Sequence, residues 1–307
     1  MGGHHHTHGH EHRPARDADR RWLAAALVIL LLFMVGEVVV AVVAGSLALL
    51  ADAGHLLTDV GALAGALWAA GLAARPARGR WTFGWQRAEI VSAALNGITL
   101  LVVAGIVLAE SVRRLLDHPQ VAGGPVVITA LVGCAVNLLA ARLMARADRR
   151  SLNVEGAYRH VLTDLYGFAA TTIAGVVILA TGWTRADAVA SLVVVVLMVG
   201  AAWGLLHESG LVLLEAAPGD VDIAEVRRHL LEADHILAVH DLHVWTVTSG
   251  LPTLSAHLIV EDECFRDGHA PQLLDRVQEC LHGHFDVEHS TFQLEPAGHA
   301  AHEPGMH

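Results

Sequence analysis

Six long apolar segments, separated by short polar connections, constrain the fold of this chain more than any other feature. Each exceeds the roughly 20 residues that a helix needs to cross the hydrocarbon core of a bilayer. The composition agrees, because 54% of the 307 residues are hydrophobic and only 17% are charged, which is too apolar for most soluble proteins. We predict an α-helical membrane protein with six transmembrane helices, running approximately over 22–44, 46–74, 88–112, 125–146, 154–181 and 187–212.

Arginine residues cluster in alternate connections between these segments. The connections after the third and fifth segments hold only Arg113, Arg114 and Arg185. Because basic residues favour the cytoplasmic side of a membrane, both termini are predicted to be cytoplasmic. The clusters assigned to that side are Arg13, Arg16, Arg20 and Arg21, then Arg75, Arg78, Arg80 and Arg87, then Arg142, Arg146, Arg149 and Arg150.

The composition becomes that of a soluble domain from about residue 217. "DVDIAEVRRHLLEA" has helical periodicity, "LAVHDLHVWTVT" and "PTLSAHLIV" are strand-like, "APQLLDRVQECLHGHF" is helical again, and "VEHSTFQLE" is a third strand. The order αββαβ predicts a small α+β, ferredoxin-like domain. The chain therefore divides into a His-rich tail (1–21), a transmembrane domain (22–216), this α+β domain (217–297) and a His-containing tail (298–307).

Two ionisable pairs lie inside the apolar segments. The second segment contains "HLLTDV", with His55 and Asp59, and the fifth contains "HVLTDL", with His160 and Asp164. Residues four apart share one face of a helix, and both aspartates fall near the middle of the membrane on antiparallel segments. Imidazole nitrogens and carboxylate oxygens are good Zn²⁺ ligands. We predict a tetrahedral metal site built from these four side chains.

Other interpretations of the pairs lead to different classes of protein. A His–Asp hydrogen bond within one helix would explain a single pair, but a carboxylate at mid-membrane is by default functional, and the pair occurs twice. A membrane metalloenzyme needs an open metal position and a general base, typically as HExxH, and this sequence has no such motif. We therefore expect no enzyme. A metal-sensing receptor, with the C-terminal domain as its output, remains a weaker alternative.

Charge and cysteine content exclude further partners. The formal net charge of −11 argues against nucleic acid and is compatible with cations. The cysteines Cys134, Cys264 and Cys280 lie far apart without CxxC spacing, so they predict neither a disulfide framework nor a thiolate zinc site. The 22 histidines are the outlier in composition, and histidine is the commonest metal ligand.

Several motifs together resemble the cation diffusion facilitators, and within them the zinc-transporter-like branch. They are "GSLALLADAGHLLTD", "RWTFGWQRAEI", "SLNVEGAYRHVLTDLYG", "HDLHVW" and "LSAHLIV", so the resemblance covers nearly the whole chain. It implies a homodimer of six-helix subunits that exchanges cytoplasmic Zn²⁺ for protons by alternating access. The alternative is an exporter with a broader or different metal preference, including Cd²⁺, Co²⁺ or Ni²⁺. We expect a multi-pass protein of a bacterial cytoplasmic membrane.

The resemblance also assigns metal ligands. His55, Asp59, His160 and Asp164 match the intramembrane site of the family, where histidine at the position of His55 goes with a preference for zinc over cadmium. Some relatives carry another site between the second and third helices, but this chain has Trp81 and Trp85 there, so we expect no metal in that connection.

The resemblance places a second set of ligands in the α+β domain. If these residues bind zinc, the domain is expected to sense it, with the metal bridging two subunits and stabilising the dimer. A dimer interface lined by histidines without metal is the alternative. The expected ligands are His240, His257, His289 and Glu295, with His243 and His269 as weaker candidates.

The histidines of the two tails are expected to be mobile, weak chelators, although a purification tag would also explain the N-terminal tract. They are His4, His5, His6, His8, His10 and His12 at one end and His299, His302 and His307 at the other.

Other polar residues within the spans receive structural predictions. Glu37, Asn137 and Asp187 are expected to join helices through interhelical hydrogen bonds. Glu155 and Arg159 are expected to form an ion pair one turn apart.

Overall fold

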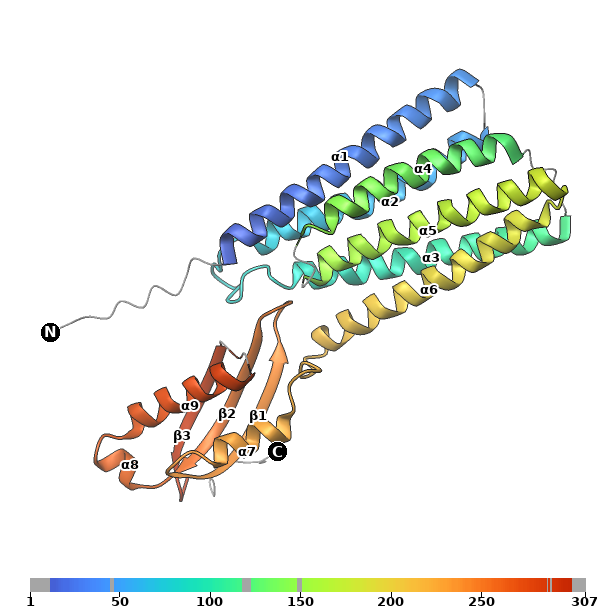
Figure 1. Ribbon diagram of the computed structural model, residues 1–307. Coiled ribbons are helices and arrows are strands. Elements are labelled where there is room, and N and C mark those ends of the chain that lie inside the picture. Colours follow the sequence, from blue (N-terminus) through green and yellow to red (C-terminus); the bar gives the residue numbers. More distant parts are fainter. Residues whose placement is uncertain are drawn as a thin grey trace. The chain divides into compact units, whose positions relative to one another are not determined.

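The computed structural model describes residues 12–44, 47–117, 123–147, 151–285, 287 and 289–299, and at several of these positions, His55 among them, only the backbone is described. The chain divides into two compact units, Met1–Ser209 and Gly210–His307. Figure 1 shows the helices of the first unit running side by side and the small sheet of the second. Each unit has its own hydrophobic core, so each is described by itself.

Within the described residues six helices form the first unit, as predicted, and the last of them continues into the second unit. Each begins and ends within a few residues of the predicted apolar segment, except that α1 begins ten residues earlier, at His12. The helices are α1 (His12–Ala44), α2 (Leu47–Ala73), α3 (Ala88–Asp117), α4 (Gly123–Met144), α5 (Leu152–Thr181) and α6 (Arg185–Leu213).

The surfaces of these helices are those of a membrane protein. Within the described residues, α1, α3, α4, α5 and α6 are long and apolar enough to cross a bilayer, and the described apolar part of α2, Asp59–Ala73, is shorter. Large apolar side chains point outward, including Leu32, Ile106 and Trp203, each more than half exposed. A soluble protein rarely leaves so much apolar surface in water. The multi-pass membrane fold predicted from the sequence is confirmed.

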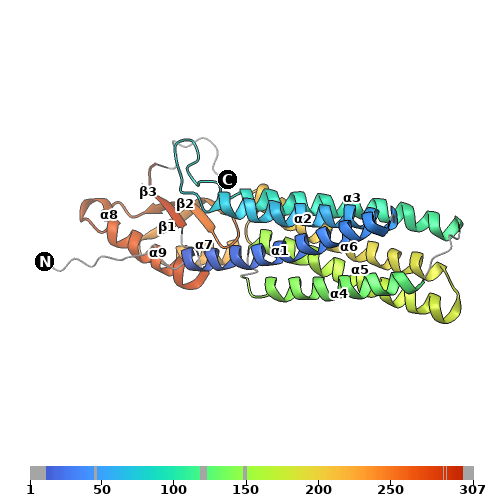
Figure 2. The same cartoon turned by 90° about the horizontal axis from the view of Figure 1, so that it is seen from above.

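Buried apolar clusters hold the bundle together, one of them joining α5 and α6 through Ile178 and Ala186, and both views show the helices side by side (Figures 1 and 2). Helices α1, α2, α4 and α5 share a buried cluster that includes Leu23, Leu63, Met144 and Val161. Helices α3 and α6 share a second cluster around Leu100 and Leu205. In a membrane such contacts are stabilised mainly by close van der Waals packing.

Two glycines serve specific geometric needs in α4 and α5. Gly182 ends α5 in the left-handed conformation, with φ 71°, and its N–H donates to the carbonyl of Ile178; this conformation favours glycine. Gly133 lies where α4 meets the ring of Phe168, and a Cβ at this position would come within 2.5 Å of that ring. The missing side chain therefore allows α4 and α5 to pack closely.

The second unit contains the predicted αββαβ order with one additional short helix, α8. Strand β1 pairs antiparallel with β2, and β2 pairs parallel with β3, giving the sheet order β1-β2-β3. The two longer helices and the strands contribute to one core, which includes Val226, Leu258 and Leu273. The elements are α7 (Ile223–Leu231), β1 (Ile236–Thr246), β2 (Pro252–Val260), α8 (Glu263–Arg266), α9 (Ala270–Phe285) and β3 (His289–Pro296).

Alternation along the strands separates two faces of the sheet. Leu254, Leu258 and Val260 on β2 are fully buried in the core shared with α7 and α9. Because successive side chains of a strand point to opposite faces, His257 and the neighbours that share its face point away from these helices. The polar candidate ligands on β2 and β3 therefore lie on the face that α7 and α9 leave uncovered.

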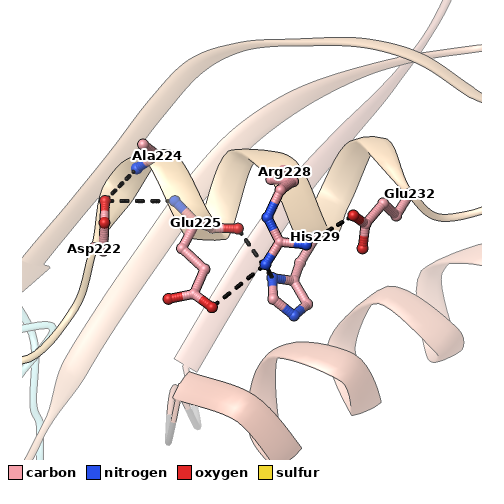
Figure 3. Close-up of polar contacts among 6 residues, drawn as sticks. All are labelled: Asp222, Ala224, Glu225, Arg228, His229 and Glu232. Carbon is pink, nitrogen blue, oxygen red and sulfur yellow. Dashed lines mark hydrogen bonds and ion pairs between the residues drawn. The ribbon is translucent and has the colours of Figure 1, made fainter.

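Local polar contacts explain why α7 begins where it does (Figure 3). The carboxylate of Asp222 accepts hydrogen bonds from the backbone N–H groups of Ala224 and Glu225, at 2.9 and 3.4 Å. This is an N-terminal cap, which satisfies two of the backbone donors that the first turn leaves free. Further along, Arg228 forms ion pairs with Glu225 and Glu232 on the exposed face.

Candidate functional site

Three of the four side chains predicted to bind metal within the membrane meet between α2 and α5. The Nε2 atom of His160 lies 2.8 Å from Oδ1 of Asp59 and 3.7 Å from Oδ2 of Asp164. One possible ligand atom from each residue lies within 4.8 Å of the other two. Ligands at about 2.0–2.1 Å from a tetrahedral ion lie about 3.3 Å apart, so the observed separations bracket the spacing that such an ion needs.

The environment of this cluster is unusual for acidic side chains. Asp59 and His160 are buried, with 5% and 4% of their surface exposed, and Asp164 is only partly accessible. Burying carboxylates among apolar helices costs free energy unless cations or hydrogen bonds compensate them. A single imidazole faces both carboxylates here, so the group of three has acidic character and is suited to a divalent cation.

The fourth predicted ligand, His55, lies on α2 one turn before Asp59. Its backbone is helical, which places it on the same face of α2 as Asp59. Its side chain lies outside the described part of the structure.

A cavity of about 390 Å³ leads away from the two aspartates. Phe168 and Met198 contribute to its apolar wall. Hydroxyl groups interrupt that wall at Ser111, Thr163, Thr171 and Ser191. The far end is charged and is lined by Glu110, Arg114 and Asp187, near the end of α3 and the beginning of α6. The cluster is therefore connected to the end of the bundle where α5 ends and α6 begins.

The opposite end of the bundle is tied together by hydrogen bonds between helices. The buried amide of Asn153, at the start of α5, donates to the carbonyl of Ala66 on α2 at 2.7 Å. The amide of Asn96 on α3 donates to the carbonyl of Gly156 on α5 at 3.0 Å. These contacts join α2, α3 and α5 on the side of His160 away from the cavity.

The ion pair predicted between Glu155 and Arg159 is confirmed at 2.8 Å. Arg159 also lies 3.6 Å from the carboxylate of Glu208 on α6. The predicted interhelical role of Asp187 is confirmed too, because it pairs with Arg114 of α3 at 3.0 Å.

Asn137 was predicted to form a hydrogen bond to another helix, but its described hydrogen bond lies within its own helix. Its amide donates within α4, to the carbonyl of Gly133 one turn earlier, at 3.1 Å. Glu37 is buried in α1.

A second group of possible ligands lies on the uncovered face of the small sheet. Oε2 of Glu295 lies 3.2 Å from Nε2 of His240, and Oε1 lies 2.8 Å from Nδ1 of His257. The two imidazole rings meet edge-on, with centroids 5.0 Å apart. Glu295 is only 1% exposed, so a buried carboxylate is held between two imidazoles on adjacent strands.

The remaining candidate ligands of this domain lie apart from the group formed by His240, His257 and Glu295. His289 is on the same face of β3 as Glu295, but six residues earlier, opposite Thr253. At about 3.3 Å per residue this separation is about 20 Å, so a shared face does not make these two side chains converge. The position opposite His257 is occupied by Gln293, whose amide donates to Oε1 of Glu295 at 2.9 Å. The sequence did not predict this hydrogen bond from Gln293 to Glu295.

The two weaker candidate ligands, His243 and His269, lie beside carboxylates of their own neighbours in the sequence and not beside Glu295. His243 is more than half exposed and lies 3.9 Å from Asp241. His269 lies 2.8 Å from Asp267, and the hydrogen bond between them lowers the pKa of that carboxyl. A similar hydrogen bond, from Nδ1 of His235 to the carboxylate of Glu261, raises the pKa of His235.

The other sequence predictions concern the connection after α2 and the two tails. In the connection, the rings of Trp81 and Trp85 lie against each other at an interplanar angle of 31°, with centroids 4.1 Å apart. The N-terminal histidines at 4–10 and those at 302 and 307 lie outside the described residues.

Comparison with known proteins identifies the family. The model of the cation efflux transmembrane domain matches residues 23–214. This chain belongs to the cation efflux family. A second family model, described as the cytoplasmic domain of cation efflux proteins, matches residues 218–297. The resemblance to the cation diffusion facilitators inferred from the motifs is therefore confirmed.

Several named relatives match this chain over nearly its whole length. The zinc transporter ZitB of Escherichia coli is 39% identical and spans 95% of this chain and 92% of its own. The metal cation efflux system protein CzcD of Cupriavidus metallidurans is 37% identical, over 94% and 90%. A "Cadmium, cobalt and zinc/H(+)-K(+) antiporter" of Bacillus velezensis is 33% identical, over 95% and 93%. The protein is therefore a multi-pass membrane protein that functions in the efflux of metal cations.

Proposed function

We propose that the protein exports Zn²⁺ from the cytoplasm in exchange for protons, by alternating access around a site formed by His55, Asp59, His160 and Asp164. The observation that carries this proposal is the meeting of Asp59, His160 and Asp164 between two helices. The zinc transporter ZitB is among the relatives, which supports zinc as a substrate.

The geometry of His160 supports coupling between metal and protons. The same atom, Nε2, faces both Asp59 and Asp164. A neutral imidazole can give the lone pair of this atom to a metal, whereas a protonated one directs its N–H at the carboxylates. Metal and proton therefore compete for one nitrogen and for the same carboxylates. Loading from a neutral cytoplasm and release to a more acidic exterior follow without a separate proton path.

The arrangement of the bundle supports alternating access. A cavity reaches Asp59 and Asp164 from one end, while hydrogen bonds such as that from Asn153 to Ala66 join the helices at the other. With the orientation predicted from the arginine clusters, the joined end is cytoplasmic and the cavity leads to the exterior. A second conformation would open the joined end and close the cavity around the same midplane site.

The range of metals is a second proposal that the relatives favour. The names of two relatives include cadmium and cobalt, or metal cations in general. Two carboxylates and one or two imidazoles also suit Co²⁺ and Cd²⁺, because such a ligand set is of intermediate softness. Zinc is proposed as the preferred substrate on the ligand types, with histidine at position 55.

The C-terminal domain is proposed to bind zinc through His240, His257 and Glu295 and to stabilise a homodimer. Three side chains leave a tetrahedral ion one ligand short, and a residue of a second subunit or a water would complete it. If zinc binds only the folded dimer, it shifts the equilibrium toward the dimer by mass action. The domain would then sense cytoplasmic zinc.

Transport in proteoliposomes tests the proposed function. Wild-type protein is expected to move Zn²⁺ toward the acidic side of an imposed proton gradient. Protons move in the opposite direction, so the pH of the acidic side is expected to rise. His160→Ala protein, reconstituted at the same density, is the matched control and is expected to be inactive. Zinc flux that does not change when the pH gradient is reversed would refute the exchange mechanism.

A further inference from the structure

The cavity that begins at the proposed transport site ends at a charged group that the exchange mechanism does not use. On α3, Nε of Arg114 lies 3.0 Å from Oε1 of Glu110, one turn earlier. Its Nη1 lies 3.0 Å from Oδ2 of Asp187, at the beginning of α6. One guanidinium thus holds two carboxylates of the cavity wall on two different helices.

The position of this group places it on the route out of the cavity. All three residues line the same cavity as Asp59 and Asp164. Arg114 is three residues from the end of α3, and Asp187 is the third residue of α6. Glu110 and Arg114 are each nearly half exposed, whereas Asp187 is 13% exposed. A cation that leaves the two aspartates through the cavity passes this group.

The charges of the group suit release better than binding. Glu110 and Asp187 without a counterion would place two negative charges in the mouth, and a pair of carboxylates can hold a divalent cation. With Arg114 between them the sum is a single negative charge, which attracts a cation weakly. A permeation path needs sites that an ion can enter and also leave. Arginine keeps its charge at any physiological pH, so this balance persists when the exterior is acidic.

We propose that Arg114 sets the charge of the release path, keeping Glu110 and Asp187 from trapping the divalent cation as it leaves the transport site. The inference rests on the proposed function, because it assumes that a divalent cation crosses the cavity. A purely structural role, in which Arg114 only ties α3 to α6, predicts lost stability but no change in how external metal affects transport.

Inhibition of export by external Zn²⁺ separates the two roles. In proteoliposomes, Zn²⁺ is added in increasing amounts on the side to which metal is released, and the concentration that halves the export rate is measured. Arg114→Gln protein is expected to be inhibited at a concentration about tenfold lower than wild type, which corresponds to tenfold tighter binding in the mouth. Arg113→Gln is the matched control, since it removes the same charge from the adjacent position, which does not line the cavity.

Two further variants make the test decisive. The double variant Arg114→Gln, Glu110→Gln restores the single negative charge and is expected to return the inhibitory concentration to that of wild type. Asp187→Asn removes a carboxylate and leaves Arg114 in place, so it is expected to be inhibited less than wild type. This variant also provides the answer if Arg114→Gln protein does not accumulate in membranes.

The outcomes are distinguishable from failure of the proposed function. Wild-type protein that moves no Zn²⁺ in any gradient would refute the function itself. Normal export in which Arg114→Gln and Arg113→Gln show equal sensitivity to external Zn²⁺ would overturn the inference alone. The same holds if removing Glu110 fails to rescue, or if Asp187→Asn is inhibited as strongly as wild type.

Discussion

Nε2 of His160 lies 2.8 Å from Oδ1 of Asp59, across the boundary between α5 and α2. The two residues are 101 positions apart in the chain, so their contact depends on the packing of whole helices. Nδ1 of the same ring is buried and has no hydrogen-bond partner within the described residues. The ring is therefore oriented by the carboxylates it faces, and any change to Asp59 or Asp164 removes part of that orientation as well as a ligand.

The first prediction concerns these carboxylates. Asp59→Asn and Asp164→Asn are each expected to lower the rate of zinc transport by more than about a hundredfold, because losing even an outer partner of a metal ligand costs 10–100-fold. The measurement is initial zinc flux in proteoliposomes at equal protein density. Thr163→Val is the matched control, since it changes a polar residue of the cavity wall that is not proposed to bind metal. Equal losses in all three variants would contradict a specific role for the aspartates.

The second prediction concerns the joined end of the bundle. Asn153→Ala removes the buried hydrogen bond to the carbonyl of Ala66 and leaves that carbonyl without this donor. Interhelical hydrogen bonds in membranes contribute about 0.6 kcal/mol on average, so the melting temperature of the detergent-purified protein is expected to fall by about one degree. Thr172→Val provides the comparison, because the hydroxyl of Thr172 donates within its own helix, to the carbonyl of Phe168 at 2.8 Å. A larger loss for Thr172→Val would show that the contact between α2 and α5 contributes little.

The apolar segments and the αββαβ order could be predicted from the sequence because both depend on local periodicity. Helices α1–α6 and the strands lie where hydropathy and alternation place them. The proximity of Asp59, His160 and Asp164 could be predicted for a similar reason. A spacing of four residues places both members of each pair on one face of a helix, and two such helices facing each other suffice to form the site.

Contacts that depend on depth along an element could not be predicted in this way. Alternation alone places His289 and Glu295 on one face of β3, and the prediction that they converge left out the rise of about 3.3 Å per residue, which separates them by about 20 Å. Asn137 donates within α4, because a short polar side chain in a helix can bond to the carbonyl one turn earlier instead of to another helix. The cavity and its charged mouth require the packing of α2, α3, α5 and α6 together, which no single segment encodes.

The third prediction is a pH dependence in the C-terminal domain. The carboxylate of Glu261 accepts a hydrogen bond from His235 and raises the pKa of that imidazole, so the folded domain holds this proton more tightly than the unfolded chain. The stabilisation is fully present below the ordinary histidine pKa of about 6.5 and is lost as the pH rises through the raised value. Wild type is therefore expected to exceed Glu261→Gln in urea midpoint at pH 5.5, with the difference shrinking by pH 9.

The comparison can be made on residues 210–307, which form a compact unit with its own core. Glu263→Gln is the control, because Glu263 is an exposed acid of the adjacent helix α8. It should show the same small difference from wild type at both pH values. A difference for Glu261→Gln that grows toward pH 9 would have the wrong sign and would contradict the role given to His235.

The fourth prediction distinguishes the ligands on the small sheet. Zinc titration of residues 217–298 is expected to show binding that His240→Ala and Glu295→Gln each weaken by at least about tenfold, as expected when one of few ligands is lost. His289→Ala is the matched control, since it removes a histidine from the same face of the same strand as Glu295. Because the side chain of His289 lies at the other end of β3, the zinc affinity of the His289→Ala domain should equal that of wild type. If His289→Ala weakens zinc binding as much as His240→Ala, the ion is held elsewhere or between two subunits in a way that brings His289 to it. In that case the mass of the zinc-bound species, measured by light scattering, would show whether a second subunit supplies the missing contact.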